Sequence, residues 1–247
     1  MDRQSLEQYL DQLLAAASIE DYCPNGLQVE GRSDVRTIVS GVTASQALID
    51  AAVAAGADAL LVHHGLFWRG DSGRLTGYRR ARVAALIRAD INLFAYHLPL
   101  DVHAELGNNT QLGIRLGVTR SGSLDRAGLI ALGTFAEPTS LGTVVSRVAK
   151  TLGREPLVIG EPDQPITRVG WCTGAGQRFI EDAWPHVDLF VTGEISEQTV
   201  HVARECRIAL IGAGHHATER YGVQALGEHL ARECGLTHLF IDIDNPA

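Results

Sequence analysis

Leu60-Leu61-Val62-His63-His64-Gly65 is the stretch that decides the fold. Its three aliphatic residues predict the end of a buried strand, and two histidines follow directly. Successive side chains on a strand point to opposite faces of the sheet, so both imidazoles can serve one site only if the strand breaks there. Gly65 permits such a break. Because open α/β sheets bind ligands at the carboxyl ends of their strands, His63 and His64 are predicted to anchor a metal centre.

Strands and helices alternate along most of the chain. A strand at 35–42, a helix capped by Thr43 or Ser45, and a strand at 58–64 form a strand–helix–strand unit, which usually closes onto a parallel sheet. The alternation predicts an α/β fold. Further strands, most of them separated by helices, are expected near 91–96, 129–135, 157–159, 168–172, 188–192, 208–212 and 239–243.

The two halves of the chain resemble each other. Residues 57–64 superpose on residues 187–194, and His97-x-x-x-Asp101 superposes on His215-x-x-x-Glu219. The similarity predicts two α/β lobes, 1–124 and 125–247, related by pseudo-twofold symmetry with a dinuclear metal site between them. The C-terminal segment of the second lobe is free to pack on the first.

Five residues at or just beyond predicted strand ends form the expected ligand set: His63, His64, Asp101, His215 and Glu219. Mixed imidazole and carboxylate ligation suits Fe, Zn, Mn or Ni rather than Ca, which prefers oxygen alone. Carboxylates can bridge two cations, so Asp101 and Glu219 are the candidates that contact both. The set predicts two divalent metal ions per subunit.

Two further residues are candidates for proton transfer. His97 lies four residues before Asp101 and is predicted to be a sixth ligand or a proton carrier beside the ligands. Glu194 takes the place of His64 in the second copy and is a candidate general base. Aromatic residues in the loop Phe67–Tyr78 either stack a planar substrate or form a hydrophobic anchor or a subunit contact.

Composition excludes several classes of protein. The net charge is −8 and no Lys/Arg run is present, so nucleic acid is an unlikely partner. The polar N-terminus and the lack of a long apolar run predict a cytoplasmic protein that does not contact a membrane. Four cysteines without CxxC spacing indicate reduced thiols. The turn at 173–176 either holds an anion or is a tight turn between strand and helix.

Several spaced motifs together resemble the NIF-three-like family, whose bacterial members are often named GTP cyclohydrolase 1 type 2 homologues. The motifs are Asn25-Gly26-Leu27-Gln28-Val29, Val62-His63-His64-Gly65, Tyr96-His97-x-x-Leu100-Asp101 with Asn108-Asn109, Val191-Thr192-Gly193-Glu194, and Gly214-His215-x-x-x-Glu219. The resemblance covers residues 5–243 and matches the short bacterial type. It implies a two-domain α/β subunit, a toroidal homohexamer with dinuclear sites facing its cavity, and metal ligation by the five residues named above.

The predicted activity is metal-assisted hydrolysis of an unidentified small molecule, such as a purine-type ring, a cyclic amide or a phosphoester. Two alternatives belong to other classes. A metal-binding or metal-delivery protein would hold exchangeable ions without turnover, and a scaffold protein would lose its fold when structural ions are chelated.

Overall fold

The computed structural model describes all residues from 1 to 247, and the chain forms two compact units, each with its own sheet. Unit 1 contains Met1–Leu106 and Gly222–Asp244, and unit 2 contains Gly107–Tyr221 and Asn245–Ala247. The division differs from a single boundary at 124/125. Residues 107–124 fall in unit 2, and residues 222–244 return to unit 1.

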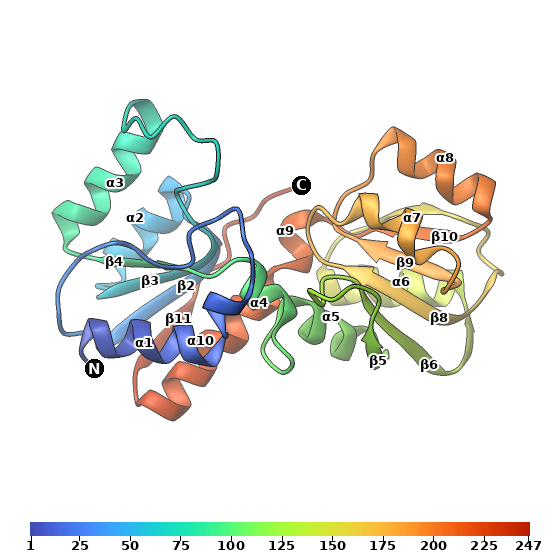
Figure 1. The fold of residues 1–247 in the computed structure, drawn as a ribbon, viewed down its shortest axis with the longest axis horizontal. Helices are drawn as coiled ribbons and strands as arrows, with labels where there is room; N and C mark the ends of the chain where they lie inside the picture. The colour runs from blue at the N-terminus through green and yellow to red at the C-terminus, as the bar shows by residue number, and fades with distance from the viewer. The chain divides into compact units, whose positions relative to one another are not determined.

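Unit 1 is built on a five-stranded sheet of order β1-β4-β3-β2-β11, in which only β1 runs antiparallel to its neighbour (Figure 1). Its elements are α1 (Arg3–Leu13), η1 (Ala16–Ser18), β1 (Gly26–Val29), β2 (Thr37–Thr43), α2 (Gln46–Ala54), β3 (Ala59–His64), α3 (Gly77–Ala89), β4 (Asn92–Ala95), α4 (Leu98–Val102), most of α10 (Arg220–Cys234) and β11 (Thr237–Phe240).

The alternation of side chains along β3 explains why helices cover both faces of this sheet. Leu60 and Val62 pack in one core with α2 and α3, while Ala59 and Leu61 pack in another with α1 and α10. A strand buried on both faces carries apolar residues at every position, as β3 does before its histidines. The carboxyl end of β3 is therefore held rigidly by two cores.

Unit 2 is built on a six-stranded sheet of order β5-β6-β8-β9-β10-β7, with β8, β9 and β10 parallel. The helices α5 and α6 pack on one face of this sheet, and α7 and α8 pack on the other. Its elements are α5 (Asn108–Leu116), β5 (Thr119–Ser123), β6 (Ala131–Ser140), α6 (Leu141–Leu152), β7 (Leu157–Ile159), β8 (Pro165–Cys172), η2 (Gln177–Phe179), α7 (Ile180–Ala183), β9 (Leu189–Thr192), α8 (Glu197–Cys206), β10 (Ala209–Gly212) and α9 (His215–Thr218).

The two sheets share a strand order over four strands. In unit 1, β1 pairs antiparallel with β4, next to parallel β3 and β2; in unit 2, β7 pairs antiparallel with β10, next to parallel β9 and β8. This likeness agrees with a duplicated chain, while the pseudo-twofold axis stays a prediction.

The strand register corrects one part of the predicted repeat. Val62 pairs with Ala95, and Thr192, the residue predicted to correspond to Val62, pairs with Gly212. Two residues after each partner stand His97 and Gly214, which are also the residues that precede α4 and α9. The superposition of His97 on His215 is therefore wrong by one residue, because sequence identity at a histidine outweighed the position of the strand end.

Two predictions about the chain as a whole can be compared with the structure. No disulfide joins any of the four cysteines; Cys23 and Cys172 are buried, and Cys206 and Cys234 are partly buried. None of the helices combines the length and the hydropathy that a membrane span requires.

Candidate metal centre

The histidine pair lies at the end of β3, and the strand continues through both residues instead of breaking between them. The imidazole centroids of His63 and His64 are nevertheless only 4.6 Å apart. Gly65 is needed for space and not for a left-handed turn, because a Cβ there would lie 2.3 Å from the amide oxygen of Gln28. That amide accepts a hydrogen bond from the Leu66 backbone and fixes the chain just after the pair.

Both imidazoles of the pair are held through their Nδ1 atoms. The Nδ1 of His63 lies 3.1 Å from the carbonyl oxygen of Tyr96, and the Nδ1 of His64 lies 3.1 Å from the hydroxyl of Thr43. A carbonyl only accepts hydrogen bonds, so Nδ1 of His63 carries the proton and Nε2 carries the lone pair in the neutral ring. Partners of this kind orient metal-binding histidines in proteins.

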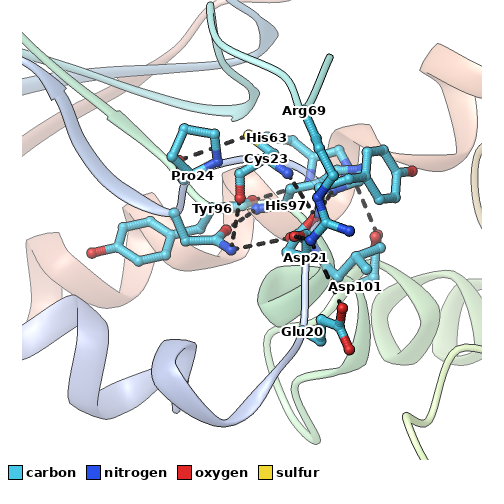
Figure 2. Close-up of polar contacts among 12 residues, drawn as sticks. Glu20, Asp21, Cys23, Pro24, His63, Arg69, Tyr96, His97 and Asp101 are labelled. Atoms are coloured by element: carbon cyan, nitrogen blue, oxygen red, sulfur yellow. Dashed lines mark hydrogen bonds and ion pairs between the residues drawn. The ribbon is translucent and has the colours of Figure 1, made fainter.

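His97 follows the same rule through a residue that sequence reasoning missed. Its Nδ1 lies 2.9 Å from Oδ1 of Asp21, and a carboxylate also only accepts (Figure 2). The Asp21 side chain is 3% exposed and also accepts from the backbone amides of Tyr22 and Leu98. Burial alone would raise the pKa of Asp21, but the hydrogen bond and charge of His97 and the bonds from Asn25 and Leu98 lower it to about 2.

One feature of the sequence indicates a structural role for Asp21. It stands just before Cys23-Pro24-Asn25-Gly26, a turn in which an aspartate commonly accepts hydrogen bonds from residues one or two positions later. Nothing in the sequence connects it to His97, which lies 76 residues away and reaches it only through the fold.

The unit 1 residues form one compact donor set. A ring nitrogen from each of His63, His64 and His97 lies within 4.8 Å of the others. Oδ1 of Asp101, a buried residue of α4, lies 3.5 Å from Nε2 of His63. Within this unit the structure therefore brings together four of the predicted site residues.

The unit 2 residues form a second set, in which one imidazole lies between two carboxylates. Nδ1 of His215 is 2.7 Å from Oε1 of Glu194, and its Nε2 is 3.2 Å from Oε2 of Glu219. Burial would lower the pKa of His215, but both carboxylates stabilise its charged form and raise the pKa to about 9. Glu194 also accepts from the side chain of Gln177, so both of its oxygens have partners.

The turn at 173–176 supports this second set. Gly174 has a φ of +62°, and a Cβ at this position would lie 2.0 Å from Oε1 of Glu219 and 3.0 Å from Nε2 of His215. Its carbonyl accepts from the backbone amides of Gly193 and Glu194. The turn is therefore a tight connection that packs against the carboxylate of Glu219 and the imidazole of His215. A tight turn was one of the two predictions for this segment.

The aromatic residues of the Phe67–Tyr78 loop separate into two environments. The Trp68 ring lies 5.1 Å from the His97 ring and 5.9 Å from the His64 ring. Tyr78 is 64% exposed, and its ring is covered by the guanidinium of Arg82. Of the two, only Trp68 contacts the histidines.

The donor chemistry fits divalent transition-metal ions. The rings of His63, His97 and His215 each have a hydrogen-bond acceptor at Nδ1, which makes Nε2 the atom suited to bind a cation. Buried carboxylates supply charge and oxygen ligands beside them, as zinc, iron, manganese and nickel sites require. Calcium does not suit a set with this many ring nitrogens.

Comparisons with known proteins cover the whole chain. The family model Duf34/NIF3 (NGG1p interacting factor 3) matches residues 1–246. A Pseudomonas aeruginosa protein named GTP cyclohydrolase 1 type 2 homolog is 54% identical, with 98% of each chain covered. An Escherichia coli K12 protein of the same name is 50% identical, with 100% of each covered.

Solved structures agree with this assignment. The protein ybgI, described as of unknown function, has a TM-score of 0.97 at 50% identity, with 100% of each chain covered. A protein from Thermus thermophilus has a TM-score of 0.92 at 36% identity, again with 100% of each covered. The resemblance found in the sequence motifs is thus confirmed: this chain belongs to the Duf34/NIF3 family.

Proposed function

We propose that the chain is a metal-dependent hydrolase that opens a purine-type ring or a related cyclic amide. The observation that carries the proposal is the common orientation of the imidazoles, in which acceptors hold Nδ1 of His63, His97 and His215. Proteins use this arrangement to present Nε2 to a metal ion. The purine ring is suggested by relatives that are named GTP cyclohydrolase 1 type 2 homologs.

In this proposal two divalent ions are bound per chain, by His63, His64 and Asp101 and by His215 and Glu219. That both donor sets serve a single dinuclear centre, with Asp101 and Glu219 contacting both ions, is part of the same proposal. Divalent ions supply Lewis acidity, which makes water a stronger acid and polarises the bond under attack.

The protein residues supply positioning and proton transfer. Asp21 holds the proton of His97 on Nδ1, so that Nε2 carries the lone pair of the neutral ring. His97 is therefore our candidate for the proton carrier. Glu194 contacts His215 directly, and its contacts favour orienting that ring over the general-base role expected from the sequence.

Activity against GTP and small cyclic amides tests the hydrolase. We expect Asp101→Ala to lower kcat/KM by at least about 100-fold. Loss of a residue that only hydrogen-bonds to a metal ligand already lowers activity or metal affinity by about 10- to 100-fold, and loss of a ligand should cost more. His201→Ala is a matched control, since this exposed imidazole of α8 belongs to neither donor set. Equal rates in the wild type and in Asp101→Ala would refute the proposal, and metal bound without turnover would favour the metal-delivery alternative.

The dinuclear part has its own test. Metal analysis of protein purified without added metal should give two ions per chain, and one or none after His215→Ala. Manganese-loaded protein should give the electron paramagnetic resonance spectrum of a coupled ion pair. Spectra of two isolated ions would indicate that the two donor sets bind separate ions. This result would overturn the shared centre but would not contradict metal binding.

A further inference from the structure

A pocket of about 330 Å³ opens beside the unit 1 histidines. It is formed by two segments, residues 21–24 and residues 67–69, and its volume lies at the lower end of small-molecule sites, which span about 300–1,000 Å³. The segments are joined by hydrogen bonds from Arg69, whose backbone amide donates to the Tyr22 carbonyl and whose guanidinium donates to the Asp21 carbonyl. The pocket is therefore preformed.

The walls of this pocket are aromatic and continue into the imidazole cluster. The Tyr22 and Trp68 rings lie 5.8 Å apart, and each makes an edge contact with His97, at 4.9 Å and 5.1 Å. Tyr22 is 51% exposed, so part of its ring faces solvent at the pocket. A planar ligand stacked here would lie against two rings that both contact His97.

Charge in and around the pocket is divided between its interior and its rim. The Asp21 carboxylate points inward to His97, Asn25 and Leu98 and is 3% exposed, so it does not face a ligand. Arg69 stands at the rim, 66% exposed, with Glu20 3.8 Å away and 90% exposed (Figure 2). The Arg69–Glu20 ion pair is weak because both side chains are largely exposed, and a stronger anion such as phosphate can replace Glu20 while Arg69 keeps its bond to the Asp21 carbonyl.

We propose that this pocket is the specificity site for a purine nucleotide, with the base stacked on Tyr22 and Trp68 and the phosphate bound by Arg69. The inference rests on the proposed function for the chemistry that follows binding, and it assigns the part of the substrate that each side chain recognises. Aromatic walls bind any planar base, while the guanidinium at the rim favours a ligand that also carries an anion such as phosphate.

Calorimetric titration of the full chain, as purified, tests the pocket with three probes: GMP, guanosine and ribose 5-phosphate. We expect Trp68→Ala to weaken GMP binding by about 10- to 100-fold, the usual effect of removing a stacking partner. Arg69→Ala should weaken GMP roughly threefold to tenfold more than it weakens guanosine, because loss of the bond to the Asp21 carbonyl affects both ligands and loss of the phosphate contact affects GMP alone. Trp184→Ala is the matched control, an exposed tryptophan at the end of α7 in unit 2.

Each outcome decides the inference independently of the hydrolase. Weaker GMP binding in Trp68→Ala, with unchanged metal content, supports the pocket even if no probe is hydrolysed. Equal GMP affinity in wild type and Trp68→Ala overturns it, as does the absence of GMP binding at millimolar concentration. Turnover of GTP with an unchanged KM in Trp68→Ala would likewise overturn the pocket while leaving the hydrolase proposal standing.

Discussion

Units 1 and 2 use the same strand arrangement to present opposite donor chemistry. At the end of β3, unit 1 carries His63 and His64; at the corresponding end of β9, unit 2 carries Gly193 and Glu194. The glycine is required, because a Cβ on Gly193 would lie 2.6 Å from the Gly174 carbonyl oxygen and 2.7 Å from Cα of His215. Unit 1 is thus rich in imidazole and unit 2 is rich in carboxylate.

The likeness extends to an aspartate that organises each sheet. Asp58 Oδ2 accepts from the backbone amides of Arg36 and Thr37 at the start of β2. Asp188 Oδ2 accepts from the amides of Thr167 and Arg168 in β8. The two units therefore have a similar backbone frame and differ in the residues at their strand ends.

The largest effect is expected from Gly174→Ala, because the added Cβ disrupts the donor set of unit 2. A Cβ 2.0 Å from the Glu219 carboxylate, on a backbone with φ +62°, should displace that carboxylate and lower the free energy of unfolding by about 2–4 kcal/mol. Denaturant unfolding and metal analysis measure the two consequences.

Gly153→Ala is a control that separates backbone strain at a positive φ from a clash of the added Cβ with its neighbours. Gly153 has a φ of +71° and open space around the added Cβ, so its substitution should cost only about 1–2 kcal/mol. If Gly174→Ala costs no more than this control and retains full metal content, the support assigned to Gly174 is disproved.

The partners of His97 and His215 are expected to differ in importance. Asp21 is buried with several donors, so Asp21→Asn should lower the free energy of unfolding by about 1–3 kcal/mol and metal affinity by roughly 10- to 100-fold. Glu194 is 41% exposed, and Glu194→Gln should cost no more than about 1 kcal/mol. Unfolding curves and metal titrations of both variants give the ranking, and a reversed order would contradict it.

The smallest expected difference is the one between Asp58→Asn and Asp188→Asn, which tests whether the two aspartates are equivalent. Each Asp→Asn change should lower the free energy of unfolding at neutral pH by about 1–2 kcal/mol, because strand-initiating hydrogen bonds to a charged acceptor weaken. Urea unfolding measures both. Losses that differ by more than about 1 kcal/mol would show that the two aspartates are not equivalent.

Asp188 adds a pH dependence with a definite sign. Burial raises its pKa, but bonds from Arg168 and Thr167 and the charge of Arg168 outweigh this and leave the pKa below its usual value. A carboxyl with a lowered folded-state pKa stabilises the fold above its unfolded pKa, near 3.9, and loses this contribution as the pH falls through the folded value. The gap between wild type and Asp188→Asn should therefore close below about pH 4; a gap that persists into stronger acid would contradict it.

The sequence predicted the local pattern well and the long-range partners poorly. Apolar runs before His63 and before Gly193 located β3 and β9, because buried strands have a distinctive composition. The short helices α4 and α9 and the edge strand β5 carry no such signal and were missed. The partnership of Asp21 with His97 was also missed, since it is created only when a turn and a distant strand end are brought together.

The return of residues 222–244 to unit 1 has a consequence for biosynthesis. Unit 2 is almost entirely contiguous, from 107 to 221, and all of this segment is synthesised before β11. Until then β2 has no strand on its outer edge, and the apolar surface that α10 will cover is open. The amino-terminal unit is therefore translated first and completed last, because its sheet and its apolar surface wait for the last residues of the chain.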